Sequence, residues 1–373
     1  MSHIDDLIQG LCPNGVPYLR IGDVAHVGTG SSDRKDQASD GKYPFFVRSA
    51  QPLRHNQYEF DETAIIIPGE GSIGSIFHYI EGKYALHQRA YRISFKEDQQ
   101  VKIYPKFAYY WFQKKFKSHI SRRWVAATVT SIRKPMIVEF RIPTPPLEIQ
   151  RVIADILDKF VILEKELEKE LIARRTQLDL FRDMLLSPWF CSERATTQLD
   201  NIVTLKAGKS IKSALISNES SEEFKTPCYG GNGIRGYVSL QPTSESLPLI
   251  GRQGALCGVV NWAEGPFYAT EHAVTVTPKR DVVTRWIYHL LISMNLNQYA
   301  TKSAQPGLAV KNLNRLRIDL PPLEKQKRDA TVLDELDRLV NDTCAGIPAE
   351  IAARRKQYEY YRDKLLTFKE LEV

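Results

Sequence analysis

Two long stretches of the chain carry apolar side chains at helical spacing. In the first stretch the apolar residues stand three or four positions apart almost throughout, at Ile149, Ile153, Ile156, Phe160, Leu163, Leu167, Leu171, Leu178, Phe181 and Leu185. Charged residues such as Glu164 and Lys165 fall outside this stripe. The spacing predicts one amphipathic helix of about 40 residues, roughly 60 Å long. A similar stripe predicts a second helix from about Leu323 to Phe368.

Prolines mark the limits of these helices. Pro145-Pro146 and Pro321-Pro322 precede the two stripes, and Pro188 follows the first. A proline is tolerated at the start of a helix, where its missing N–H leaves no hydrogen bond unmade. Inside the second stripe, the segment 346–349 contains a glycine and Pro348, and we expect it to bend or break that helix.

A long helix with one apolar side needs a surface to cover that side. Its own duplicate is the obvious partner, and coiled-coil packing is the natural geometry. Two copies related by a pseudo-two-fold axis would run antiparallel. The alternative is that each helix lies separately on its own domain.

The chain repeats itself once. Residues 145–150 (PPLEIQ) match residues 321–326 (PPLEKQ) at an offset of 176. Residues 173–186 match residues 353–366 at an offset of 180, and 8 of these 14 positions are identical. A period this long is not that of a solenoid and indicates two copies of a whole domain-plus-helix unit.

Weaker matches extend the repeat upstream. They pair 21–24 with 199–202, 106–109 with 285–288, and 141–142 with 317–318. We therefore expect an α+β protein with two mixed α/β domains, each followed by a long helix. The predicted boundaries are an N-terminal segment 1–17, a first domain 18–144, a first helix 145–187, a second domain 188–320 and a second helix 321–373.

The globular parts show both strand and helix patterns. Residues 64–67 and 273–276 are strand-like, whereas 109–116 and 286–294 are helix-like. Glycine-rich segments at 69–74 and 251–254 predict tight turns after strands. His87 and His272 follow similar local sequences and are predicted to occupy comparable places, as partly buried structural residues or as base contacts.

Composition fits a protein of the cytoplasm. The five cysteines, Cys12, Cys191, Cys228, Cys257 and Cys344, are scattered and form no C-x-x-C pair. Free thiols in a reducing compartment are therefore expected, without a structural zinc site. No apolar run is long enough to cross a bilayer.

Catalytic motifs are missing from the sequence. The segment 206–210 ends in Gly-Lys-Ser, but Val203 stands where a phosphate-binding loop needs glycine. The spacing of the glycines at 69–74 does not fit a dinucleotide fingerprint, and no metalloprotease or Ser-His-Asp pattern can be traced. We therefore expect no catalytic residue, no metal ligand and no cofactor site in this chain.

The net charge of +7 and the pI near 9.0 permit binding to a polyanion. Single basic residues are more often solvated surface, but clusters favour phosphate contact. Candidates for phosphate contact are Arg34, Lys35, Lys114, Lys115, Arg122, Arg123, Arg133, Lys134, Lys209, Lys212 and Lys311. Candidates for base contact, because of their hydrogen-bonding side chains, are Arg48, Asn232, Arg235, Arg252, Gln253, His272 and Gln305. Because they recur in both helices, we assign another set to helix packing or subunit docking: Arg174, Arg175, Gln177, Arg354, Arg355 and Gln357.

These features together resemble the specificity subunit of Type I restriction-modification systems. The residues that carry the resemblance are Leu11-Cys12-Pro13-Asn14-Gly15-Val16, the two Pro-Pro-Leu-Glu-x-Gln helix starts, and the paired Arg-Arg-x-Gln and Arg-Asp-x-Leu-Leu segments. The resemblance covers essentially the whole chain. It implies two target recognition domains that each read one half of a split DNA target, with the paired helices setting the spacer between the halves.

The resemblance also implies partners. The helices would bind two copies of a modification subunit, which carries S-adenosylmethionine and methylates adenine in double-stranded DNA. Restriction subunits would join them and supply ATP- and Mg²⁺-dependent translocation and cleavage. The low similarity between residues 44–93 and 227–277 predicts an asymmetric target, because two unlike readers do not match a palindrome.

Three other functions remain open at this point. The chain could serve as the specificity module of a combined nuclease–methylase, as a stand-alone DNA-binding regulator, or as a structural protein whose helices mediate assembly. A regulator would bind DNA tightly alone, whereas a structural protein would show no sequence preference.

Overall fold

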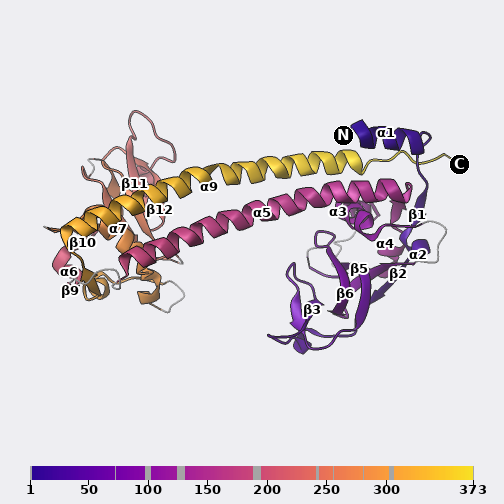
Figure 1. Ribbon diagram of the computed structural model, residues 1–373, viewed down its shortest axis with the longest axis horizontal. Coiled ribbons are helices and arrows are strands. Elements are labelled where there is room, and N and C mark those ends of the chain that lie inside the picture. Colours follow the sequence, from indigo (N-terminus) through magenta and orange to yellow (C-terminus); the bar gives the residue numbers. More distant parts are fainter. Residues whose placement is uncertain are drawn as a thin grey trace. The chain divides into compact units, whose positions relative to one another are not determined.

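The computed structural model describes residues 2–71, 73–96, 102–123, 131–187, 195–240, 243–254, 256–279, 281–301 and 306–372. The chain forms two compact units. Unit 1 consists of Met1–Leu167 and Ala349–Val373, and unit 2 of Glu168–Pro348. Each unit contains one sheet domain and parts of both long helices (Figure 1).

The sheet domain of unit 1 is built on a six-stranded sheet in the order β2-β7-β5-β6-β3-β4. All its neighbouring strands are antiparallel except β3 and β6, which are parallel. A separate antiparallel pair joins β1 to β8. The elements are α1 (Ser2–Leu11), β1 (Tyr18–Arg20), α2 (Ile21–Val24), β2 (Ala25–Thr29), β3 (Tyr43–Phe46), β4 (Leu53–His55), β5 (Phe60–Pro68), β6 (His78–Leu86), β7 (Ala90–Phe95), α3 (Pro105–Arg123), α4 (Lys134–Val138) and β8 (Arg141–Pro143).

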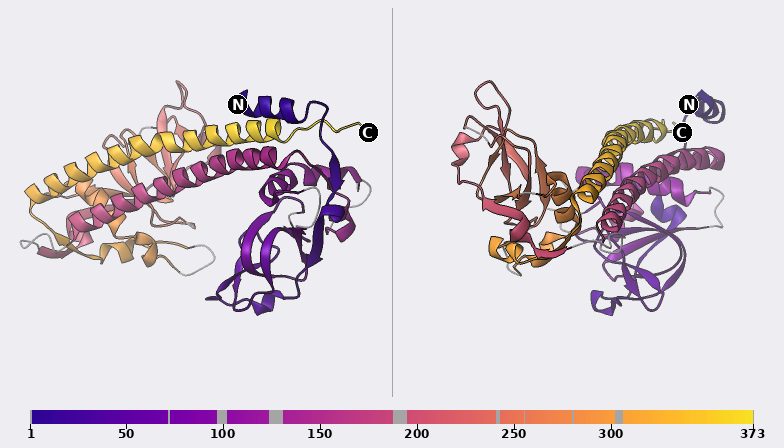
Figure 2. Two further views of the ribbon diagram at one scale, coloured as in Figure 1. Left: turned by 45° about the vertical axis from the view of Figure 1, so that its right-hand side comes forward. Right: turned by 60° about the vertical axis from the view of Figure 1, so that its left-hand side comes forward.

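The core of unit 1 lies between this sheet and the helices. Ile65, Ile67 and Ile93 face Phe107 and Phe112 of α3, and all five side chains are almost fully buried. The same cluster includes residues near the start of the first long helix, so α3 packs between the sheet and that helix (Figures 1 and 2). The strand predicted at 64–67 and the helix predicted at 109–116 are both confirmed, as parts of β5 and α3.

Unit 2 repeats this plan with one interruption. Strand β6 of unit 1 corresponds to two shorter strands, β14 and β15, so the six-stranded sheet becomes a four-stranded one and a three-stranded one. The elements are β9 (Ala195–Gln198), α6 (Leu199–Ile202), β10 (Val203–Ala207), β11 (Thr226–Gly230), β12 (Gly233–Val238), β13 (Leu247–Gly251), β14 (Val260–Ala263), β15 (Tyr268–Ala269), β16 (Ala273–Pro278), α7 (Thr284–Ser293), α8 (Val310–Asn314) and β17 (Arg317–Leu320).

The weak upstream matches of the sequence repeat correspond to equivalent elements. Helices α2 and α6 both follow the first strand of their domain, and helices α3 and α7 occupy the same place in the order. Strand β8 pairs antiparallel with β1, as β17 does with β9. The strand expected at 273–276 and the helix expected at 286–294 are present as parts of β16 and α7, with α7 ending at Ser293.

The two long helices are confirmed, although the second ends three residues before the predicted Phe368. Helix α5 spans Leu147–Leu186 and α9 spans Leu323–Leu365, each directly after its proline pair. The two helices lie side by side and antiparallel within each unit (Figures 1 and 2). In unit 1 the Phe160 and Tyr361 rings stack at 5.5 Å between centroids, and Arg355 Nε donates to Glu164 Oε1 at 2.6 Å. The alternative of two separate helices is therefore wrong.

The same pairing occurs in unit 2. Arg182 Nη2 donates to Asp337 Oδ1 at 3.0 Å, and Lys325 Nζ donates to the Leu185 carbonyl at 3.4 Å. Along these contacts the residue numbers on α9 fall as those on α5 rise, so the two helices run antiparallel. The side chain of Arg182 is 5% exposed, so this ion pair is shielded from water.

The break expected at residues 346–349 does not occur. Helix α9 is continuous through Pro348, and the flanking Ile347 and Ile351 are both buried. A proline inside a helix costs a hydrogen bond, but burial of apolar neighbours on both sides offsets that cost.

One buried glutamine fastens each long helix to its domain. The Gln150 amide accepts from the Tyr104 N–H at 2.7 Å and donates to the carbonyls of Lys102 and Pro145. Gln326 repeats all three bonds, with the Val283 N–H and the carbonyls of Asp281 and Pro321. This role explains why the glutamine of the Pro-Pro-Leu-Glu-x-Gln segment recurs in both copies.

A carboxylate on each long helix makes a second repeated link. Asp158 on α5 binds Lys106 at 3.3 Å and the hydroxyl of Tyr110, both on α3. On α9, the Asp334 carboxylate accepts from Arg285 Nε and contacts His289 Nε2, each at 2.8 Å. Helix α3 is thus held to α5, and α7 to α9, by a basic residue and a second hydrogen-bonding residue four positions later.

Within the described ranges, no helix is both long enough and apolar enough to cross a membrane.

Candidate nucleic-acid interface

Several turns of unit 1 come together at one end of its sheet. The Gly69 N–H donates to the Arg89 carbonyl, and the Ile132 N–H donates to the Gly69 carbonyl. Isolated bridges join Glu70 to Ser131 and Ser32 to His87. Segments that lie far apart in sequence therefore form one surface, which we call the unit 1 turn cluster: residues 31–36, 47–49, 69–71, 87–89 and 131–133.

The unit 1 turn cluster presents a carboxylate between two guanidinium groups. Glu70 accepts from Arg48 Nη1 at 3.0 Å and from Arg89 Nη1 at 3.1 Å. These two arginines, Arg89 first, hold the pKa of the Glu70 carboxyl below its ordinary value, so it stays ionised. Beside them, Gln88 Nε2 donates to Asp33 Oδ2 at 3.0 Å.

Unit 2 forms the same turns from different residues. The Arg252 N–H donates to the His272 carbonyl, and the Leu308 N–H donates to the Arg252 carbonyl. A bridge joins Gln253 to Gly307, as Glu70 is joined to Ser131. We call this surface the unit 2 turn cluster: residues 209–213, 230–235, 252–254, 270–272 and 306–307.

Strand register establishes which residues are equivalent. Pro68 pairs with Ala90 in unit 1, and Gly251 pairs with Ala273 in unit 2. Counting from these pairs, Glu70 corresponds to Gln253 and Arg89 to His272. Gly71 and Gly254, one position further, have φ of 90° and 89°, a left-handed conformation that favours glycine. The turns therefore have matching backbones.

The predicted equivalence of His87 and His272 is wrong by two residues. By the same register, the residue of unit 2 that is equivalent to His87 is Thr270, and both side chains are buried. Burial lowers the pKa of His87 below its ordinary value, which favours the neutral ring. His87 is thus the structural histidine, whereas His272 is half-exposed at the surface of its turn cluster.

The loops 87–89 and 270–272 have the same length, and the Ala90 N–H donates to the His87 carbonyl as the Ala273 N–H does to that of Thr270. The sequence match misled because the tyrosines that anchor it, Tyr84 and Tyr268, are not equivalent by register.

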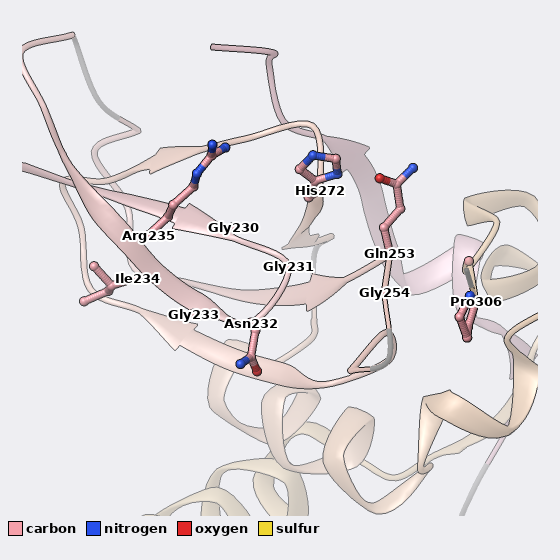
Figure 3. A pocket seen from close by; sticks show the side chains of 11 residues that line it. Gly230, Gly231, Asn232, Gly233, Ile234, Arg235, Gln253, Gly254, His272 and Pro306 are labelled. Carbon is pink, nitrogen blue, oxygen red and sulfur yellow. The ribbon is translucent and has the colours of Figure 1, made fainter. Parts of the chain in front are cut away.

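The unit 2 turn cluster surrounds an open groove of about 730 Å³. Four candidates for base contact line it: Asn232, Arg235, Gln253 and His272. In Figure 3, Arg235, His272 and Gln253 stand on one side of the strand ends, and Asn232 points the other way. Arg252 is half-buried beside the groove. Amide, imidazole and guanidinium groups are the ones that bind base edges and phosphates.

Further basic candidates stand on segments of the two turn clusters or beside them. Arg34 and Lys35 are exposed on the 3₁₀ turn Arg34–Asp36. Lys209 and Lys212 are exposed at the equivalent place in unit 2, before the 3₁₀ turn Ser213–Leu215. The remaining three are exposed at the starts of α4 and α8: Arg133, Lys134 and Lys311.

Lys114 has a different role from the one predicted. Its ammonium group donates to the carbonyls of Asp363 and Leu366 and to the Thr367 hydroxyl, which lie at the end of α9. Only 10% of its side chain is exposed, and burial lowers its pKa below the ordinary value. All three N–H donors are used, so Lys114 caps the C-terminus of α9 and has no N–H left to donate to a phosphate.

Lys115 is the next candidate on α3. Lys115 lies 6.0 Å from the Trp111 ring and borders a small surface pocket with His119. The side chains of Arg122 and Arg123, and the whole of Gln305, lie outside the described residues.

The candidates on the long helices divide into three kinds. Arg355 packs across the helix pair through Glu164. Arg174 and Arg354 form ion pairs along their own helices, with Glu170 and Glu350. The others are exposed: Arg175, Gln177 and Gln357, of which Gln357 accepts from Arg354 Nη1 at 3.1 Å.

Sequence reasoning missed Glu70, Gln88 and Arg89. Glu70 was hidden inside a glycine-rich turn, and an acidic residue is not an obvious DNA contact. The signal that could have found it is the glycine that follows, because Gly71 and Gly254 mark equivalent turns in the two copies.

Within the described part of the chain, no group of three or more His, Cys, Asp or Glu side chains could hold a metal ion.

Comparison with known proteins gives consistent matches over most of the chain. The family model described as "Type I restriction modification DNA specificity domain" matches twice, at residues 13–174 and 192–353. The specificity subunit of the type I restriction enzyme EcoprrI of Escherichia coli is 33% identical over 371 residues, which cover 91% of this chain and 92% of that protein. A putative type I specificity subunit of Mycoplasma pneumoniae is 27% identical and covers 84% of this chain and 96% of its own length.

Solved structures show the same fold. The crystal structure of a type I restriction-modification S subunit from M. genitalium superposes with a TM-score of 0.60 at 18% identity, over 94% of this chain and 96% of that one. A chain from a study of assembly and conformational transition in the type I system gives 0.57 at 16% identity, over 95% and 98%.

Proposed function

Because the chain belongs to the family of type I restriction-modification DNA specificity proteins, we propose that it reads a DNA target in two unlike halves, one with each turn cluster. The chain is a specificity subunit, the non-catalytic component that recognises DNA sequence and directs the restriction-modification complex. The kinship does not favour a stand-alone regulator or a purely structural protein.

The observation that carries the proposal is the pair of matching turns with different side chains. Glu70 and Gln253 occupy equivalent positions, as do Arg89 and His272. Equal backbones would present both sets to DNA in the same way, but the hydrogen-bonding groups differ. Two readers of different chemistry select two different half-sites, so the target is split and asymmetric.

The long helices would set the spacing between the two half-sites and receive the partner subunits. Arg175 and Gln177 on α5, and Gln357 on α9, are exposed and come from the repeated segments. A repeated docking surface is expected to bind two copies of a modification subunit. S-adenosylmethionine, ATP and Mg²⁺ would be bound by the partner subunits, and the complex would work on DNA in the cytoplasm.

Methylation mapping tests this function. The chain is expressed with its modification subunit in a host that lacks DNA methylation, and adenine methylation is mapped by long-read sequencing. We expect a split, asymmetric motif that is methylated only when this chain is present. Replacing residues 18–144 by the first domain of another specificity subunit should change one half of the motif and leave the other half intact.

Two results would contradict the proposal. One is the same methylated motif with and without the chain. The other is an absence of methylation when the modification subunit is soluble and binds S-adenosylmethionine. A palindromic motif would contradict the two-reader part alone.

A further inference from the structure

Residues 70 and 253 project from the same point of the same turn in the two units. Each follows the strand that pairs with β7 or β16, and each forms a bridge to the segment before α4 or α8. Each also precedes a glycine with φ near 90°: 90° for Gly71 and 89° for Gly254. A side chain placed by equal backbones reaches an equal place on a bound duplex, so a difference at this position becomes a difference in the base that is read.

In unit 2 this position carries an amide. Gln253 is exposed at the edge of the 730 Å³ groove, and no hydrogen bond of its side chain to another described residue is seen. Its groove neighbours Arg235 and His272 lie on the same side (Figure 3). A carboxamide can accept from adenine N6 and donate to adenine N7 at once, and no other base offers that pair in the major groove.

In unit 1 the same position carries an ionised carboxylate whose charge is balanced by two guanidinium groups. Glu70 binds Arg48 and Arg89, whose side chains are 49% and 57% exposed. A lone carboxylate would be repelled by DNA, but two guanidinium groups reverse the local charge. The carboxylate also holds the guanidinium groups in place, which prepares them to donate to guanine O6 and N7. A carboxylate oxygen can in turn accept from cytosine N4, so both halves of this group favour a G·C pair.

We propose that residues 70 and 253 are the equivalent base-selecting positions of the two domains. Gln253 selects an A·T pair in the half-site read by unit 2. Glu70, with Arg48 and Arg89, selects a G·C pair in the half-site read by unit 1. This inference rests on the proposed function, because it assumes that both turn clusters face DNA.

Reciprocal substitutions at the two positions provide the test. Glu70→Gln and Gln253→Glu are each introduced into the full chain, which is expressed with its modification subunit, and adenine methylation is mapped again. Exchange of domain 18–144 assigns each half of the motif to its domain. We expect Gln253→Glu to relax or change selection at one A·T pair in the second domain's half only. Glu70→Gln should act at one G·C pair in the other half only.

A matched control separates base reading from charge. Glu222→Gln removes the same charge as Glu70→Gln from an exposed residue before β11. Gly230, at the other end of that strand, belongs to the unit 2 turn cluster, whereas Glu222 does not. We therefore expect the motif of Glu222→Gln to equal that of the wild type.

A binding measurement covers variants that no longer support methylation. The complex is titrated with duplexes that carry adenine or 7-deazaadenine at the selected A·T pair. Loss of N7 should weaken binding of the wild-type complex, and the full bidentate contact should be worth roughly tenfold to a hundredfold in affinity. With Gln253→Ala the 7-deaza substitution should have no further effect, because the amide that reads N7 is gone.

Each other result has a defined meaning. Unchanged motifs in both variants, effects in the same half, or equal 7-deaza effects in wild type and Gln253→Ala would overturn the inference and leave the proposed function standing. If the wild-type chain itself directs no methylation, the proposed function and this inference both fail.

Discussion

Buried polar side chains on the long helices decide how each recognition domain is held. Gln150 and Gln326 are 0% and 1% exposed. Each satisfies one N–H and one carbonyl of the segment before α3 or α7, and one carbonyl of the proline pair that precedes its own helix. A buried amide group without partners is costly, so these residues permit little variation. The carboxylates Asp158 and Asp334 add a charged contact at the next turns of the same helices.

The Asp334 link of unit 2 contains a histidine, which the Asp158 link of unit 1 lacks. Unit 1 uses the Tyr110 hydroxyl where unit 2 uses His289, which is fully buried. Burial lowers the pKa of His289 below its ordinary value of 6.5, although the hydrogen bond to Asp334 opposes this. Asp337 also favours the charged ring, and Arg182 disfavours it.

The stability of unit 2 should therefore depend on pH through His289. Below pH 6.5 the unfolded chain binds a proton that the folded chain excludes, so this stability is present above 6.5 and is lost as the pH falls. We expect the melting temperature of the wild type to fall more between pH 7.5 and about 5.5 than that of His289→Gln, which keeps a donor for Asp334 but does not titrate. Equal falls in the two proteins, measured by calorimetry, would refute this.

At the scale of the element, the long helices owe their continuity to packing. Helix α9 carries Gly346 and Pro348, two residues of low helix propensity, yet it runs unbroken from Leu323 to Leu365. Buried residues flank this weak segment, among them Cys344, Ile347 and Ile351. Tertiary contacts thus outweigh the local preference that, in the sequence alone, predicted a break at this segment.

Gly346 gives a direct test of that balance. A Cβ atom at this position would meet nothing within 4 Å, so alanine fits without a clash. We expect Gly346→Ala to stabilise the chain by about 0.5–1 kcal/mol, because alanine loses less backbone entropy in a helix. Urea unfolding followed by circular dichroism measures this. The control is Gly30→Ala, whose Cβ would collide with the Leu86 carbonyl and should destabilise.

At the scale of the whole molecule, the basic residues fall into two groups: those bound within the protein and those exposed to solvent. The net charge is +7, but some cations are bound within the protein, as Lys114 is, whereas others are exposed beside the turn clusters. Only exposed cations can release counterions from DNA, so they should account for the salt dependence of binding without altering the sequence that is read.

The salt dependence of DNA binding tests this division. We expect Arg34→Ala with Lys35→Ala to weaken binding uniformly across sequences and to make the slope of log K against log salt shallower by about 1–2. The control is Lys225→Ala, which should leave the slope unchanged. Lys225 is exposed and directly precedes β11, and the unit 2 turn cluster lies at the other end of that strand. A changed methylation motif in the Arg34/Lys35 variant would show base reading instead of phosphate contact.

The sequence by itself determined the features that depend on local pattern. The duplication, the two amphipathic helices with their proline starts, and the strands at 64–67 and 273–276 all follow from spacing along the chain. The family resemblance also rests on such local segments, repeated at fixed offsets.

Only the tertiary structure decided which residues meet at the turn clusters. Glu70 and Arg89 lie 19 positions apart and come together because β5 pairs with β7, and the same register makes Gln253 the counterpart of Glu70. A strand register depends on contacts between distant segments, so no local pattern shows whether His87 matches Thr270 or His272. For the same reason, Lys114 looked free in sequence and is bound to residues more than 240 positions away.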